Sequence, residues 1–349
     1  MAETLNMMRV MARAGDDGKQ ERYQLPCVAL RDVRILQHVE HMLEAGGGQL
    51  KFFPQDHFME HKHLYMLEKD ERGQHYSYML SAEAAVQGRF SALAVLPTAA
   101  FAVRAEFPDL PLLVKLNASV DDPVDKRQVR VGTIHDAIDV GADAVGLTIY
   151  YGSQYLPEMT EHLVEVAEGC AEFGLPLIVW NYPRGNAVDK VEETQVHCQF
   201  AGAAHILETT AGRVIPILKM KISTPYKKAD WDAGTYAKTK LGKPEKAGDP
   251  VPPHVAKWLD MPRAQLIEKL VDYVHRVYGV VSVMSGGEMP KKDDEKAQAQ
   301  FEQDLLDGIG KDRHWGVIVG RSTWGLGSVD AMVKHGTMLS EHLPNVEIG

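Results

Sequence analysis

Two lysines, Lys219 and Lys221, lie two residues apart in the otherwise apolar segment 217–221. Side chains two apart in a strand point to the same face. If that face is the inside of a barrel, burial and mutual repulsion disfavour the charged ammonium. The pKa of at least one lysine should then fall and leave an amine nucleophile. Alternatively, one lysine faces inward and the other lies past the strand end in solvent.

Two glycine-containing turns, Ser285-Gly286-Gly287 and Gly320-Arg321-Ser322, could bind phosphate. Glycine lets backbone N–H groups approach an anion closely, a following helix N-terminus adds positive potential, and Arg321 can supply a bidentate contact. The glycines could instead only shape tight turns. Their position after the last two apolar runs of the chain favours a phosphate site.

A third motif is Trp180-Asn181-Tyr182, in which the tyrosine shares a strand face with the tryptophan. This segment and the lysine pair should end neighbouring strands, so Tyr182 should lie near Lys219, where a phenol can donate or accept a proton. Packing is the alternative role for both aromatic side chains. Other polar side chains that end apolar runs are candidates for substrate contacts: Asp56, Lys115, Asn117 and Arg184.

Eight short apolar runs alternate with helix-like segments along the chain, which predicts a parallel sheet closed as a (β/α)8 TIM barrel. Leu163, Val166 and Cys170 recur at helical spacing and predict an amphipathic cover helix over 157–173. The predicted strands are 49–54, 90–97, 111–117, 144–150, 176–182, 214–222, 280–284 and 315–319.

The organisation predicted for the chain is a single catalytic barrel over 46–349, preceded by an N-terminal extension over 1–45. The Lys- and Pro-rich stretch 227–262 is expected to form a long loop after the sixth strand. Because long loops after barrel strands lie on the catalytic face, this loop should lie near the site.

Composition excludes several classes of protein. A net charge of -10 disfavours a nucleic-acid binder, which would need a basic face. Cys27, Cys170 and Cys198 are widely spaced without a CxxC, so no disulfide framework or thiolate metal site is indicated. Residues 1–17 contain no apolar run of signal-peptide length, and no run of about 18 apolar residues occurs, so neither secretion nor membrane insertion is expected. A reducing cytoplasm fits best.

A metal-dependent enzyme is the main enzymatic alternative, because His57, His61 and His63 lie beside Asp56 and Glu60. These residues belong to one loop, however, and a metal site there would leave the lysine pair unexplained. No metal and no other cofactor is therefore expected.

Several segments in a fixed order carry a family resemblance: 113–117, 141–153, 179–184, 218–221, 285–287 and 320–321. From Phe53 to its end, the chain resembles the class I fructose-1,6-bisphosphate aldolases of the archaeal and bacterial type, within the DeoC aldolase superfamily. The resemblance implies a lyase of glycolysis and gluconeogenesis. Such an enzyme would cleave fructose 1,6-bisphosphate into dihydroxyacetone phosphate and glyceraldehyde 3-phosphate, and would be a homo-oligomer.

The resemblance also implies roles for individual residues. Lys219 would form the Schiff base with the phosphorylated sugar, with Lys221 as its neighbour. Tyr182 would be the general acid and base, Trp180 would line the site, and Asp56 would contact substrate hydroxyls. Phosphate binding would fall to Ser285, Gly286, Gly287, Gly320 and Arg321.

The chain departs from the family pattern at two loops. Phe58 takes the place of the glycine in the family's Asp-Gln-Gly-x-Glu-His segment, and Glu288 follows the Ser-Gly-Gly turn. Because such loops determine which substrate fits, two alternatives stay open. One is a related lyase or transferase that uses Lys219 on another phosphorylated ketone. The other is a non-catalytic phosphosugar-binding barrel.

Overall fold

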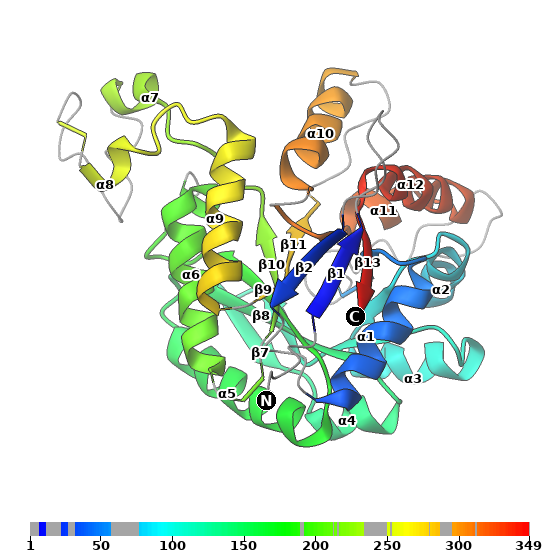
Figure 1. Cartoon of the computed structure of the whole chain (residues 1–349). Helices are drawn as coiled ribbons and strands as arrows, with labels where there is room; N and C mark the ends of the chain where they lie inside the picture. The colour runs from blue at the N-terminus through cyan, green and yellow to red at the C-terminus, as the bar shows by residue number, and fades with distance from the viewer. Residues whose placement is uncertain are drawn as a thin grey trace, which may run out of the picture.

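The barrel predicted from the sequence is confirmed by the computed structural model. The structure describes residues 7–11, 22–26, 32–56, 77–188, 192–211, 213–214, 216–233, 250–251, 253–278, 280–286, 295–310 and 313–348. Within these residues, eight parallel strands close into a barrel and follow one another around it in chain order (Figure 1). Each overlaps one predicted run. They are β3 (Leu50–Pro54), β4 (Ala92–Val95), β5 (Leu112–Lys115), β8 (Ala144–Tyr151), β9 (Leu177–Pro183), β10 (Ile217–Lys221), β11 (Ser282–Ser285) and β12 (Gly316–Ile318).

The strands are continuously apolar because both of their faces are buried. All residues of β3, β4 and β5 are buried, and Leu93, Val114, Leu147 and Ile178 have no exposed surface. A parallel strand in this fold packs against cover helices on one side and against the barrel interior on the other. A charged side chain on these strands is therefore an exception, which indicates that it has an ion-pair or hydrogen-bond partner or a functional role.

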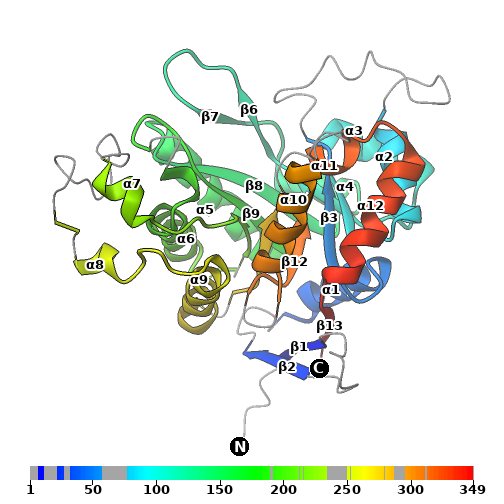
Figure 2. The same ribbon diagram turned by 90° about the horizontal axis from the view of Figure 1, so that it is seen from above.

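Helices surround the barrel (Figure 2). The predicted cover helix over 157–173 is confirmed as α5, whose Leu163 and Cys170 are fully buried and which ends at Gly174 in the left-handed region, with φ 75°. Among the described helices, none combines the length and the apolar composition that crossing a membrane requires. The helices around the barrel are α2 (Tyr78–Gln87), α3 (Pro97–Glu106), α4 (Ile134–Asp139), α5 (Leu156–Phe173), α6 (Val196–Thr210), α9 (Arg263–Tyr278), α10 (Glu295–Gly308), α11 (Arg321–Trp324) and α12 (Val329–His342).

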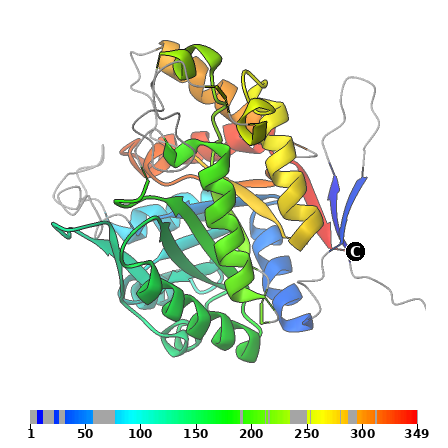
Figure 3. The same ribbon diagram turned by 90° about the vertical axis from the view of Figure 1, so that its left-hand side faces the viewer.

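The first 45 residues contain strands and a helix. β1 (Met7–Met11) and β2 (Arg22–Pro26) form an antiparallel sheet with β13 (Asn345–Ile348), which joins both ends of the chain (Figure 3). The N–H of Val346 donates to the carbonyl of Gly48 at 2.5 Å, so this sheet lies at the amino end of β3. The helix α1 (Val33–Ala45) buries Val39 and Met42 in the barrel core.

Two connections on the carboxyl side of the strands have secondary structure of their own. β5 ends at Lys115, two residues before the predicted end, and β6 (Asn117–Val120) and β7 (Arg127–Arg130) form a hairpin that extends from the barrel (Figure 2). The stretch 227–262 contains α7 (Lys228–Asp232) and α8 (Pro253–Ala256) in its described part.

Candidate active site

Lys219 points into the barrel. Its strand, β10, lies between β9 and β11, with the Cα of Lys219 in register with Trp180 and Val283. The side chain is 3% exposed. Its Nζ lies 5.3 Å from the centroid of the Trp180 ring and 5.5 Å from that of the Tyr182 ring. The predicted meeting of Lys219 with this aromatic pair is thus observed.

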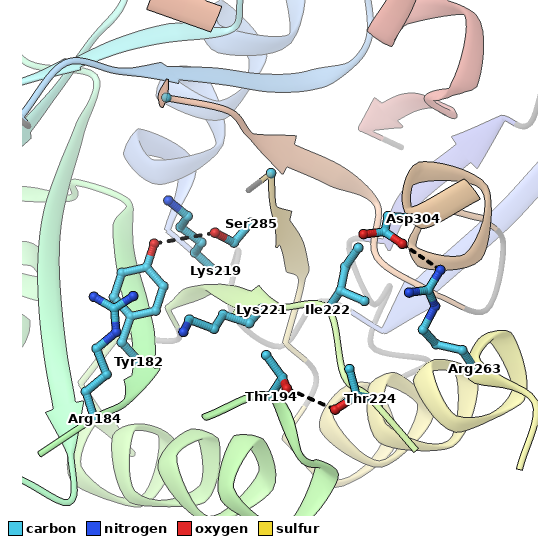
Figure 4. Close-up of a pocket in the computed structure, with 12 residues that line it drawn as sticks. Tyr182, Arg184, Thr194, Lys219, Lys221, Ile222, Thr224, Arg263, Ser285 and Asp304 are labelled. Atoms are coloured by element: carbon cyan, nitrogen blue, oxygen red, sulfur yellow. Dashed lines mark hydrogen bonds and ion pairs between the residues drawn. The ribbon is translucent and has the colours of Figure 1, made fainter. Parts of the chain in front are cut away.

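The side chain of Tyr182, on β9, contacts side chains of the next two barrel strands, β10 and β11. Its hydroxyl lies 3.4 Å from Oγ of Ser285, and Lys219 lies beside this hydrogen bond (Figure 4). Burial alone would raise the pKa of Tyr182, but the charge of Lys219, the bond to Ser285 and the charge of Arg184 together hold it below its usual value. The phenol therefore gives up its proton more readily than a tyrosine in water.

Lys221 lies beside the same ring, its Nζ 5.6 Å from the Tyr182 centroid. Its ammonium forms an ion pair with Glu193, whose Oε2 also lies 3.3 Å from Nε of Arg184. Burial and the charge of Arg184 lower the pKa of Lys221, although Glu193 acts in the opposite direction. Of the two paired lysines, Lys221 thus has the lowered pKa, and its causes are burial and Arg184 rather than repulsion by the other lysine.

A cavity of about 320 Å³ opens at the carboxyl ends of these strands. It brings the predicted Schiff-base lysine, the tyrosine and parts of both glycine turns together (Figure 4). Its lining residues are Tyr182, Arg184, Thr194, Lys219, Lys221, Ile222, Thr224, Arg263, Ser285, Gly286, Asp304 and Gly320.

The glycine turns meet at one end of the cavity. A Cβ on Gly286 would lie 2.5 Å from Cγ1 of Val319, so only glycine permits this approach of the two turns. Gly320 directly precedes α11. Gly287 and the side chain of Arg321 lie outside the described part of the chain.

A second charged pair lies deeper in the barrel. Nζ of Lys115 lies 2.5 Å from Oδ2 of Asp56, and the two side chains are 1% and 2% exposed. The Lys115 amine also lies 5.6 Å from the centroid of the Trp180 ring, which is therefore close to both Lys115 and Lys219. Gly146 makes room for this ring, because a Cβ there would lie 2.8 Å from Cζ3 of Trp180.

Asp56, Lys115 and Trp180 lie outside the cavity lining, and so does Asn117. Its Nδ2 donates to the carbonyl of Thr148, and its Oδ1 accepts from the Thr148 N–H, each at 2.8 Å. The amide group thus joins the start of the β6–β7 hairpin to β8. The sequence placed Asn117 at a strand end but could not show that main-chain groups would occupy its side chain.

Several cavity residues were not identified from the sequence. Thr194 follows β9 in a short 3-10 helix, η4 (Glu192–Thr194), and its hydroxyl lies 2.9 Å from that of Thr224. Arg263, at the start of α9, lies 2.7 Å from Asp304 of α10. None of these positions ends a strand, so strand-end reasoning had no signal for them. The predicted alternative metal residues, His57, Glu60, His61 and His63, lie outside the described residues, as do Phe58 and Glu288.

Comparison with known proteins agrees with this architecture. A family model described as DeoC/LacD family aldolase matches residues 54–234. The chain is 32% identical over 155 residues to a class 1 fructose-bisphosphate aldolase of Thermoproteus tenax, covering 43% of this chain and 55% of the relative. It is 37% identical over 97 residues to a 2-amino-3,7-dideoxy-D-threo-hept-6-ulosonate synthase of Archaeoglobus fulgidus, covering 27% of this chain and 36% of the relative. The matches thus span about half or less of these relatives.

Among solved structures, a Schiff-base-forming fructose-1,6-bisphosphate aldolase superposes with a TM-score of 0.60 at 23% identity. The superposition covers 87% of this chain and 98% of the other. At this identity the likeness establishes the shared barrel fold.

Proposed function

We propose, because the chain belongs to the DeoC/LacD family of aldolases, that it is a class I aldolase whose Lys219 forms a Schiff base with a phosphorylated ketose. The observation that carries the proposal is the position of the Lys219 amine. It is 3% exposed, lies beside the rings of Trp180 and Tyr182, and borders a cavity of about 320 Å³. A buried amine next to a phenol is suited to nucleophilic attack on a carbonyl.

In the first step, the neutral amine of Lys219 attacks the ketose carbonyl carbon and forms a carbinolamine. The former carbonyl oxygen takes one proton from the attacking nitrogen and one from solvent and leaves as water, which produces the protonated imine. This positive imine is the electron sink for the next step. The aromatic rings beside Nζ exclude water while favouring a cation at this position.

In the second step, the bond that breaks joins the carbon attached to the imine carbon to the next carbon of the sugar. Tyr182 as phenolate takes the proton of the hydroxyl on that next carbon. That carbon becomes an aldehyde, and the electrons of the carbon–carbon bond move into the imine to form an enamine. Tyr182 then returns its proton to the enamine carbon, and water hydrolyses the imine to release the ketone. The lowered pKa of Tyr182 suits this role, because the phenol must exchange its proton in both directions.

The phosphate of the ketose would bind at the glycine turns. Ser285, Gly286 and Gly320 line the same cavity as Lys219, so a phosphate held there would present its carbonyl to the amine. Gly287 and Arg321 complete the proposed phosphate site by their place in the sequence. The deeper pair of Asp56 and Lys115 would contact substrate hydroxyls around Trp180.

The proposed substrate is fructose 1,6-bisphosphate, cleaved to dihydroxyacetone phosphate and glyceraldehyde 3-phosphate. A second candidate is a related lyase or transferase that uses another phosphorylated ketone. The synthase relative from Archaeoglobus fulgidus shows that similar sequences carry another activity name.

A panel of phosphorylated ketoses with borohydride trapping tests both candidates. A covalent ketose adduct, detected by mass, that needs both ketose and borohydride is expected for the wild type and for Lys228→Met, which removes an exposed lysine of α7. Lys219→Met should prevent it. Cleavage of fructose 1,6-bisphosphate supports the first candidate, and trapping with only another ketose supports the second. Ligand binding without trapping or turnover would indicate a non-catalytic barrel and overturn the proposal.

A further inference from the structure

Outside the Lys219 cavity, three different metal-ligating side chains converge at the beginning of α6. They are Glu192 of η4 and the adjacent His197 and Cys198 of α6. One ligand atom from each lies within 4.8 Å of the other two. Nε2 of His197 lies 3.4 Å from Oε1 of Glu192 and 3.2 Å from Sγ of Cys198.

We propose that Glu192, His197 and Cys198 form a site for a zinc ion that stabilises the wall of the cavity without taking part in the chemistry at Lys219. Zinc binds imidazole nitrogen, thiolate sulfur and carboxylate oxygen at about 2.0–2.3 Å in tetrahedral geometry. Ligand atoms around such an ion lie about 3.3–3.6 Å apart. The two distances from the His197 nitrogen are close to this spacing.

Burial strengthens the case for a cation. Glu192 and Cys198 have no exposed surface, so the carboxylate is far from bulk water. A divalent ion at this point would bond the carboxylate, the ring nitrogen and the sulfur together. On binding, the Cys198 thiol releases its proton to solvent and the thiolate bonds to zinc. The partly exposed side chain of His197 gives access to the site, and water completes the coordination.

His197 is also held by a second contact. Its other ring nitrogen, Nδ1, forms a hydrogen bond with the hydroxyl of Tyr226, and the two rings stack with centroids 5.6 Å apart and 16° between their planes. Metal-binding histidines commonly use the second nitrogen in this way, because the bond fixes the ring and leaves the first nitrogen for the ion.

The location assigns the ion a positioning role. η4 carries Glu193, which pairs with Lys221 and Arg184, and Thr194, which bonds Thr224 in the cavity wall. An ion that joins Glu192 to the first turn of α6 would hold this short helix in place. Its loss should therefore loosen substrate binding while Lys219 can still form an imine.

Metal analysis of the whole protein, purified without chelators, is the first test, and about one zinc per chain is expected. His197→Gln and Cys198→Ser should each lose it. The matched controls are His205→Gln, on the same helix, and Cys170→Ser, the buried cysteine of α5, and both should retain it. His197→Gln carries the test if Cys198→Ser fails to fold, because His197 is only partly buried.

Replacement of zinc by Co²⁺ identifies the ligands. A near-ultraviolet thiolate-to-cobalt charge-transfer band is expected in the wild type and in Cys170→Ser, and should be absent in Cys198→Ser. Chelation should lower the Tm and raise KM, while ketose-dependent borohydride trapping continues. Absence of the band, or zinc lost only on replacing His57, His61 and His63, would overturn the proposal.

Discussion

The Lys219 amine lies 5.5 Å from the centroid of the Tyr182 ring, and the Tyr182 hydroxyl lies 3.4 Å from Oγ of Ser285. These residues come from β10, β9 and β11, so the tyrosine on one side of the lysine strand is bonded to the serine on the other (Figure 4). The proposed nucleophile and the proposed proton carrier are thus positioned by three adjacent strands.

Replacing the proposed proton carrier should slow catalysis without preventing imine formation. We expect Tyr182→Phe to lower kcat by about 10²–10⁴-fold, because a positioned general acid and base contributes about this much. Steady-state kinetics of cleavage, together with borohydride trapping, measure the two effects. A variant with unchanged kcat would show that another group moves the proton.

Removing the serine hydroxyl should change the pH dependence. The bond from Ser285 lowers the pKa of Tyr182, so Ser285→Ala should raise that pKa. Because the proposed cleavage needs the phenolate, activity rises as Tyr182 loses its proton, and this rise should move to higher pH in the variant. A pH profile of kcat/KM measures the shift. A rise at unchanged or lower pH would remove Tyr182 from the role of base.

The buried ion pair should be costly to break from one side. Lys115→Met leaves the Asp56 carboxylate without its ammonium partner, and the expected loss of unfolding free energy is about 3–5 kcal/mol. Asp56→Asn combined with Lys115→Met should recover part of this loss, since no buried charge then stays at the pair. Urea denaturation gives these values, with Lys126→Met as an exposed control expected within about 0.5 kcal/mol of wild type. Equal losses in the single and double variants would contradict the prediction.

A further lysine, Lys51 of β3, should make stability depend on pH. Its amine donates to Gly88 O, Gly336 O and Ser340 Oγ at 3.0, 2.9 and 2.6 Å. Burial, with a smaller effect from Arg89, lowers the pKa of Lys51 to about 8. Between this pH and the usual lysine pKa of about 10.4, the unfolded chain keeps a proton that the folded chain has lost, so stability rises with pH in that window.

The measurement for Lys51 is urea denaturation of wild type and Lys51→Met across this window. The variant has no proton to lose in this window. Relative to it, the free energy of unfolding of the wild type should rise by on the order of 3 kcal/mol as the pH is raised across the window. If the difference in free energy of unfolding between the two proteins does not change with pH, the three accepting oxygens keep Lys51 charged.

The strands could be predicted because each is covered on both faces, so its sequence is a continuous apolar run. The same runs make polar residues at their ends conspicuous, and the alternation of side chains along a strand placed Trp180 and Tyr182 on one face. Together these local rules led to Lys219, Tyr182, Ser285 and Gly320, which line one cavity.

The missed features depend on contacts between distant segments. Glu193 acts through Arg184 and Lys221, and Arg263 meets Asp304 from another helix. No local period relates such residues, because loop and helix packing brings them together. The proposed zinc site has no local signal for the same reason, since Glu192 precedes α6 and has no ligand-like spacing to the cysteine.

The most direct test of the central claim is the identity of the lysine that carries the imine. Wild type and Lys221→Met are treated with dihydroxyacetone phosphate and borohydride, and the modified peptide is sequenced by mass spectrometry. The adduct is predicted on Lys219 in both proteins. An adduct on Lys221 or Lys115, or none in an enzyme that turns over, would contradict the account.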